Sequence, residues 1–405
     1  MQIIALLPSR LQLPLRSRFT SASHPSRTDW RGGSQLLRRC TSQSRGGPLS
    51  SWFRHFLSPR TEGAKVLLIS LISSLISRTR LRGFLTLLKP RVMLLAVFTA
   101  FVGLMIAPGH LDPFLGSIAI LGIAAGAGAA GVLNMWYDAD IDAVMTRTAM
   151  RPIPRGTVSR VEALTFGLVL AGSGVAVLGF ALNVTAAALL AFAIFFYVVV
   201  YTIWLKRHTR QNIVIGGTAG ALPSVIGWAA ATGDIALEPF ILFLIVFLWT
   251  PPHFWALALN RTDEYARAGV PMLPVVAGRA ETTRHILIYS VLLVSISMLP
   301  WALGFASTIY GAAAVICGAI FVVLALRLGR SSEADRRAAY RLFVFSIFYL
   351  FVLFAALLTS SGGDRWSSLP SARAARAATG SLQAETLPRA VQIARSSISV
   401  RADEV

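Results

Sequence analysis

The residues best suited to chemistry are an amide and three carboxylates in one short stretch. Asn134, Asp138 and Asp142 are spaced four apart, so on a helix they share one face. Asp140 would lie on roughly the opposite side, so the carboxylates do not form one cage. Magnesium is typically held by one or two carboxylates together with substrate phosphates. The spacing therefore predicts a Mg²⁺ site at Asp138 and Asp142, beside Asn134.

Three arginines follow this acidic run, and prolines at 152 and 154 end any helix there. Guanidinium groups close to a metal-binding pair of carboxylates suggest a bound phosphate group. The alternative is a charged helix end solvated among lipid headgroups, and this stretch by itself leaves both interpretations open. The arginines are Arg147, Arg151 and Arg155.

A second, weaker version of the pattern occurs at residues 260–274. Asn260 is followed four residues later by Glu264, which lies next to Asp263, and then by an arginine and two closely spaced prolines. The apolar segments before the two copies are four apart in the chain, which suggests a duplicated helical unit. Chance similarity of short loops is the alternative. Two facing acidic loops could hold one or two magnesium ions that bridge a diphosphate.

Basic and amide side chains also follow the apolar segment that ends near residue 204. Lys206, Arg207 and Asn212 could donate to a departing pyrophosphate if they lie beside the acidic loops. When they are considered alone, plain positive charge that orients the chain in a membrane is the better explanation. Lys89, before Pro90, has the same two interpretations.

One histidine, His253, lies within an apolar stretch, directly after two prolines. An ionisable residue inside a membrane span is a candidate functional residue. A structural histidine bonded to a carbonyl that the prolines free is the alternative. Trp249 and Phe254 nearby could line a flat or isoprenoid-shaped pocket, or equally face lipid.

The composition indicates a membrane protein. The 405 residues are 55% hydrophobic and only 14% charged, whereas soluble proteins have about 25% charged residues. The net charge of +20 does not predict nucleic-acid binding, because the arginines lie in short loops and tails between apolar segments. Cys40 and Cys317 are far apart and imply neither a disulfide framework nor a cysteine metal site.

The apolar segments predict an all-α integral membrane bundle with nine spans at residues 83–358. The expected spans are 91–108, 114–136, 162–182, 184–204, 213–232, 238–259, 285–305, 307–326 and 340–358. Residues 1–63 form a basic extension expected to be disordered, with a composition that also suits a transit peptide. Residues 64–82 are expected at the membrane interface, and 359–405 form a tail expected to be disordered.

Basic loops alternate with loops that contain no lysine or arginine. The positive-inside rule places every basic loop, and the N-terminus, on the cytoplasmic side, or on the matrix side in an organelle. The expected location is a bacterial inner membrane, or alternatively a mitochondrial one. All polar motifs then meet at one face. A transporter, the non-enzyme alternative, would place its polar site near the midplane.

Together the motifs resemble the UbiA superfamily of intramembrane prenyltransferases, and most closely its heme-farnesylating branch. The matches cover roughly residues 83–358 and include the sequences at 88–91, 134–142, 151–154, 205–207, 211–217, 251–257 and 265–274. Two positions depart from the broader superfamily. Met135 stands where an aspartate is usual, as in the heme branch, and Arg267 replaces an aspartate of the second motif.

The resemblance implies Mg²⁺-dependent transfer of a farnesyl group from farnesyl diphosphate to a vinyl group of protoheme IX (heme B), giving heme O. It implies magnesium–diphosphate binding by Asn134, Asp138 and Asp142. It also suggests heme A synthase as a partner, and it leaves prenyl transfer to a quinone or chlorophyll precursor as the rival reaction. The implied diphosphate contacts are Arg147, Arg151, Lys206 and Arg207. The resemblance also carries the second acidic motif to Asp263, as a further magnesium ligand, and less securely to Glu264.

Overall fold

The structure is a computed structural model that describes residues 79–109, 111–332 and 335–359. The predicted extension at 1–63, most of the interfacial segment, and all of the tail except residue 359 lie outside these residues. Every regular element in the described part of the chain is helical. Eight of these helices are long and apolar enough to cross a membrane, and a bent pair, Thr79–Leu87 with Pro90–Ile106, brings the number to nine if it forms one span. The predicted all-α membrane fold is confirmed.

The long helices follow the predicted spans closely. They are α3 (Pro90–Ile106), α4 (Pro113–Tyr137), α6 (Arg160–Ala181), α7 (Val184–Phe195) continued by the π-helix η2 (Phe196–Leu205) and α8 (Lys206–His208), α9 (Asn212–Thr232), α10 (Leu237–Leu259), α13 (Gly278–Ser297), α15 (Thr308–Arg330) and α16 (Arg336–Leu358). The seventh span begins seven residues earlier than predicted, at Gly278, because Arg279, Glu281 and Arg284 occupy its first turns and hide it from a hydropathy reading.

Short polar side chains fix where several of these helices begin. Asp112 accepts hydrogen bonds from the amides of residues 114 and 115, at 2.9 and 3.3 Å, and so starts α4. Ser159 and Glu162 form a reciprocal capping box at the start of α6. Such caps satisfy amides that have no partner within the helix. Asn183, Ser307 and Asp335 cap α7, α15 and α16.

Helices α3 and α9 cross so closely that only glycine fits at the contact. A Cβ atom added at Gly103 would lie 2.1 Å from the Ser224 carbonyl oxygen, and one added at Gly227 would lie 1.9 Å from that of Ala100. Small residues allow this approach between membrane helices. On the outside of the bundle large apolar side chains are exposed, with Phe180 94% accessible, as expected for a lipid-facing surface.

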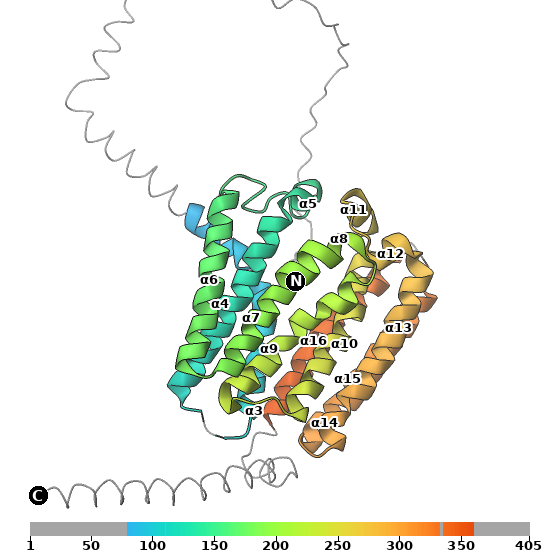
Figure 1. Cartoon of the computed structure of the whole chain (residues 1–405). Helices are drawn as coiled ribbons and strands as arrows, with labels where there is room; N and C mark the ends of the chain where they lie inside the picture. Colours follow the sequence, from blue (N-terminus) through green and yellow to red (C-terminus); the bar gives the residue numbers. More distant parts are fainter. Residues whose placement is uncertain (1–78, 110, 333–334, 360–405) are drawn as a thin grey trace, which may run out of the picture. The chain divides into compact units, whose positions relative to one another are not determined.

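The short helices that carry the polar motifs lie at one end of the bundle (Figure 1). These are α5 (Ala139–Val144), α8, α11 (Thr262–Arg267) and α12 (Leu273–Val276). Their position follows from chain direction, because α4, the α7–η2–α8 span and α10 all end there. The polar loops predicted to share one face therefore do so.

Candidate active site

The first carboxylate of the acidic run, Asp138, lies at the junction of α4 and α5 and is fully buried. Its Oδ2 accepts hydrogen bonds from Lys206 Nζ and, at 2.8 Å, from Asn134 Nδ2. Its Oδ1 has no hydrogen-bond partner among the described residues, with Arg207 Nη2 at 3.8 Å. Asp138 thus keeps one oxygen available for a ligand while Lys206 balances its charge.

The second carboxylate, Asp142, is 3% exposed and belongs to α5. Arg151 Nη1 donates to both of its oxygens, at 2.8 and 2.6 Å. The Thr148 hydroxyl donates to the Asp142 backbone carbonyl at 3.0 Å and folds the following loop back onto α5. A buried carboxylate is tolerated only when it is paired, and the loop arginine supplies that pair.

Lys89, which the sequence left as a charge that orients the membrane span, proves to be part of the site. Its Nζ donates to Asn134 Oδ1 at 2.7 Å, and Thr202 Oγ1 lies 3.0 Å from Asn134 Nδ2. Lys89 has φ 53°, and it is the one described non-glycine residue with positive φ. Pro90 signals that Lys89 is not helical, because a residue before proline is displaced from helical geometry, but it does not predict a left-handed conformation.

The π-helix η2 brings a further set of side chains to the site. Its i→i+5 hydrogen bonds place residues five apart on the same face. The Lys206 amide accordingly donates to the Tyr201 carbonyl, and the Thr202 hydroxyl donates to the Tyr197 carbonyl at 2.7 Å. Nothing in the sequence distinguishes a π-helix from an α-helix here, so this alignment was not predictable.

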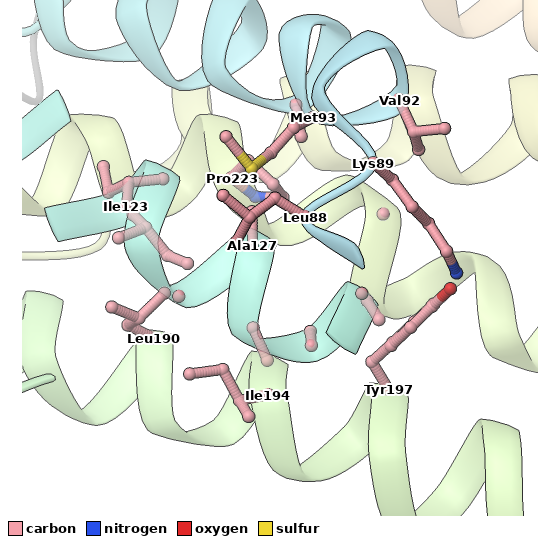
Figure 2. Close-up of a pocket in the computed structure, with 18 residues that line it drawn as sticks. Leu88, Lys89, Val92, Met93, Ile123, Ala127, Leu190, Ile194, Tyr197 and Pro223 are labelled. Atoms are coloured by element: carbon pink, nitrogen blue, oxygen red, sulfur yellow. The ribbon is translucent and has the colours of Figure 1, made fainter. Parts of the chain in front are cut away.

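Three cavities meet at this end of the bundle. A polar cavity contains Asp142 and four cationic side chains, and two apolar cavities extend from it between the helices. Tyr197 lines all three, and so marks their junction. Figure 2 shows the first apolar cavity, with Lys89 and Tyr197 pointing toward one another and aliphatic side chains beyond them. The cations of the polar cavity are Lys89, Arg147, Arg151 and Lys206.

Arg207 does not line the polar cavity but forms a paired contact with Asp140, with Nη1 and Nη2 each 2.8 Å from a carboxylate oxygen. Its guanidinium also stacks 4.7 Å above the ring of Tyr137. The Arg207 hydrogen bonds lower the pKa of Asp140 to about 2. Asp140 is exposed whereas Asp138 is buried, in line with the helical spacing, and Arg207 lies between the two carboxylates at the rim of the site.

The second acidic loop is arranged differently. Asp263 is exposed, and Glu264 accepts a hydrogen bond from Arg261 at 2.9 Å. Neither carboxylate lines the polar cavity, whereas Tyr265 of the same loop does. Across the described residues no three carboxylate, histidine or cysteine side chains gather as a metal cluster. Asp263 is therefore not brought together with Asp138 and Asp142 in this structure.

The remaining candidates lie around the site. Arg147 lines the polar cavity, and burial lowers its pKa. Asn212 is fully buried at the start of α9, and neither its Nδ2 nor its Oδ1 has a hydrogen-bond partner within the described chain. Unpaired buried amides are costly, so Asn212 suits a bound polar ligand. His253 lines the second apolar cavity.

Charge decides what this arrangement can bind. Four basic side chains, Lys89 among them, lie near two buried carboxylates. Burial lowers the pKa of Lys89 to about 7, so the site has an excess of one to two positive charges near pH 7. Such a site attracts a polyanion, and the apolar cavities beside it accept a hydrocarbon chain. Asp138 Oδ1, buried and without a hydrogen-bond partner, also fits coordination of a magnesium ion by one or two carboxylates.

The chain matches the family model of the UbiA prenyltransferase family over residues 96–363. It is 59% identical over 292 residues to a protoheme IX farnesyltransferase of Rhodopseudomonas palustris strain HaA2, covering 72% of this chain and 93% of that one. It is also 59% identical to the protoheme IX farnesyltransferase of Rhizobium rhizogenes, covering 70% of this chain and 89% of the relative.

Solved structures share the fold. A digeranylgeranylglyceryl phosphate synthase aligns with a TM-score of 0.59 at 19% identity, over 70% of this chain and 98% of its own. A UbiA homologue from Archaeoglobus fulgidus, bound to GPP and Mg²⁺, aligns with a TM-score of 0.52 at 16% identity, over 68% and 99% of the two chains. The chain therefore belongs to the UbiA prenyltransferase family, among its protoheme IX farnesyltransferases.

Proposed function

We propose that the chain transfers a farnesyl group from farnesyl diphosphate to a vinyl group of heme B and so produces heme O. The names of its close relatives support this reaction. The site supports it through a cationic cavity for a diphosphate that adjoins two apolar cavities for two hydrophobic substrates. By the positive-inside rule, the basic loops around the site support a position on the cytoplasmic side of a bacterial inner membrane, with a mitochondrial inner membrane as the alternative. Heme A synthase, which would use the product, is the proposed partner.

The proposed reaction begins when the allylic C1–O bond breaks and the diphosphate leaves with the bonding electrons. The terminal vinyl carbon of heme then forms a bond to C1. Water adds to the other vinyl carbon and loses a proton, which leaves a hydroxyethylfarnesyl group. Diphosphate and one proton are the other products. The apolar walls keep water away from the allylic cation until carbon–carbon bond formation.

Asp138 and Asp142 would hold a magnesium ion, with Asn134 beside them. Mg²⁺ bound there would neutralise charge on the departing diphosphate. Lys206 and Arg151, which pair with these carboxylates in the structure, would turn toward the phosphate oxygens. Preorganised cations aimed at the growing negative charge stabilise the transition state.

Arg147 and Arg207 complete the proposed diphosphate site from its two rims. Asn212 would donate its unpaired Nδ2 to the same ligand. In the second loop, Asp263 would reach a ligand only if α11 moved inward, and Glu264 would first have to leave Arg261. We therefore assign metal binding primarily to the first loop.

The observation that supports the proposal best is the pair of buried carboxylates, Asp138 and Asp142, each paired with a cationic side chain, with Asp142 lining the polar cavity. The purified protein in lipid nanodiscs should convert farnesyl diphosphate and heme B to heme O with added Mg²⁺, as detected by mass spectrometry. Parallel reactions with 4-hydroxybenzoate or chlorophyllide test the rival acceptors. Prenylation of either rival, with no heme O, would overturn the proposal. Heme transport without any adduct would favour a transporter.

A further inference from the structure

The orientation of His253 is fixed by a chain of two hydrogen bonds. Its Nδ1 lies 2.6 Å from the Ser346 hydroxyl oxygen. Ser346 donates its hydroxyl hydrogen to the Phe343 carbonyl at 2.7 Å, so its oxygen accepts from the histidine. Nδ1 therefore carries the hydrogen, and Nε2 keeps its lone pair.

Aromatic side chains surround the His253 ring, which also lines a cavity. Trp249 and Phe343 stack against the ring, with centroids 4.2 and 4.7 Å away. Only 2% of His253 is accessible, and the residue lines the second apolar cavity. Along the described chain, no donor to Nε2 occurs. A neutral imidazole with a held Nδ1–H and a free Nε2 has the arrangement of histidine ligands to metals.

The cavity that His253 lines adjoins the aliphatic one shown in Figure 2, and the two share Tyr197 and Gly220 in their walls. Besides aliphatic and small residues, its wall carries the aromatic side chains of Trp249, Phe254 and Tyr201, whereas Tyr197 is the one aromatic residue lining the first cavity. We call it the aromatic cavity. Tyr201 and Phe254 also line the polar cavity, so the two adjoin there. The aliphatic cavity has the surface expected for an isoprenoid chain. The aromatic one suits a flat macrocycle.

Gly220 lies between these two cavities and lines both. A Cβ atom added there would meet no other atom within 4 Å. In contrast to Gly103 and Gly227, close helix packing does not require this glycine. It leaves open space at the place where two substrates would have to approach one another.

We infer that the aromatic cavity is the site of the heme acceptor, and that His253 Nε2 is the axial ligand of its iron. This inference rests on the proposed function. Iron coordination fixes the macrocycle at one point. Tyr201 and Phe254 line both the aromatic cavity and the polar cavity, so the macrocycle would lie next to the diphosphate site. His253 is thus a substrate-positioning ligand, with Ser346 holding the correct tautomer.

The test is heme binding without prenyl diphosphate, measured by absorption and electron paramagnetic resonance spectra. Wild type should show a histidine-ligated heme. H253A should lose that signature, and because even loss of a second-shell partner costs roughly 10–100-fold in metal affinity, heme should bind at least about tenfold more weakly. Added imidazole should restore the spectrum. H285A, which alters a histidine on α13 outside the cavity, is the matched control.

Metal-free protoporphyrin IX separates coordination from packing. Wild type should prefer heme to protoporphyrin, whereas H253A should bind the two equally. An H253A protein with an unchanged heme spectrum and preference would overturn the inference even if heme O forms. Histidine ligation in a wild type that makes no heme O would instead overturn the proposed function.

Two further variants keep the test independent of protein folding. G220L should fill the space between the cavities and reduce heme binding with His253 intact. S346A should keep the histidine ligand but weaken heme affinity, because Nδ1 loses its acceptor. Farnesyl diphosphate is proposed to bind in a different cavity. Its unchanged binding to S346A would therefore show that the variant protein is folded. Full-strength heme binding in G220L would place the acceptor elsewhere.

Discussion

The loops after α4 and after α10 have similar sequences but hold their carboxylates in different surroundings. Asp138 and Asp142 are 0% and 3% exposed, and each pairs with a cationic side chain. In the second loop Asp263 is exposed, and Glu264 pairs with Arg261 three residues before it. The shared spacing of asparagine, carboxylate, arginine and proline therefore does not produce two equivalent sites.

The difference comes from the partners that each loop meets. Lys206, from the end of another span, reaches Asp138, and Arg151 folds back onto Asp142. The second loop instead presents uncharged side chains to the polar cavity, namely Tyr265, Val270 and Met272. A repeated motif thus fixes local spacing, whereas the neighbours in space decide whether its charges are buried and useful.

The strongest test of this contrast compares D142N with D263N. D142N removes one of the two buried charges while keeping the side-chain shape, and we expect kcat to fall about 10²–10³-fold, the cost of losing one preorganised electrostatic group. D263N alters an exposed side chain and should change kcat by less than about twofold. Heme O formation at saturating Mg²⁺ measures both.

Equal losses in the two variants would mean that both loops bind the metal during turnover, after movement of α11. Full activity of D142N and D138N would end the assignment of the first loop. Titration of activity with Mg²⁺ distinguishes weaker metal binding from loss of chemistry, because only the former is rescued by excess metal.

Comparison of R151Q with R261Q tests the cationic partners. A hydrogen bond to a charged group contributes about 1.5–3 kcal/mol, so R151Q should lower kcat/KM for farnesyl diphosphate roughly 10–100-fold. R151K should recover only part of this, because lysine lacks the planar fork of donors. R261Q should leave kcat/KM almost unchanged. Thermal unfolding in nanodiscs checks whether the unpaired Asp142 also destabilises R151Q.

Lys89 provides a smaller effect that separates activity from stability. Its left-handed backbone conformation, at φ 53° and ψ 55°, strains lysine more than asparagine. K89N should therefore lower kcat/KM about tenfold through loss of one charged hydrogen bond, while the unfolding temperature stays at or above that of wild type. If K89N lowered the unfolding temperature together with kcat/KM, the role of Lys89 would be structural only.

The smallest effect is expected at Asp140, outside the cavity. Because Arg207 lowers its folded-state pKa to about 2, below the ordinary value of about 3.9, the pair stabilises the protein above pH about 4, and this contribution is lost as the pH falls toward 2. The Asp140 side chain is 55% exposed, so the contribution is below about 1 kcal/mol. The unfolding temperatures of wild type and D140N should differ slightly at pH 7 and converge at low pH.

The sequence by itself determined the membrane fold, the approximate spans and the end of the bundle where the polar loops meet. These follow from local properties, namely runs of apolar residues, alternating loop charge and the four-residue spacing of Asn134, Asp138 and Asp142. The spacing also placed Asp140 correctly on another side. Sequence similarity added the family, because its motifs occur together along one chain.

Only the tertiary structure decided which charges share a cavity. The contact of Lys89 with Asn134 joins residues 45 positions apart, and that of Lys206 with Asp138 joins residues 68 apart. The π-helical turn that aligns Tyr197, Tyr201 and Lys206 has no local sequence signal, and neither has the exposure of Asp263. Pairing across helices depends on which faces pack together, and that choice is made by the whole bundle rather than by any one segment.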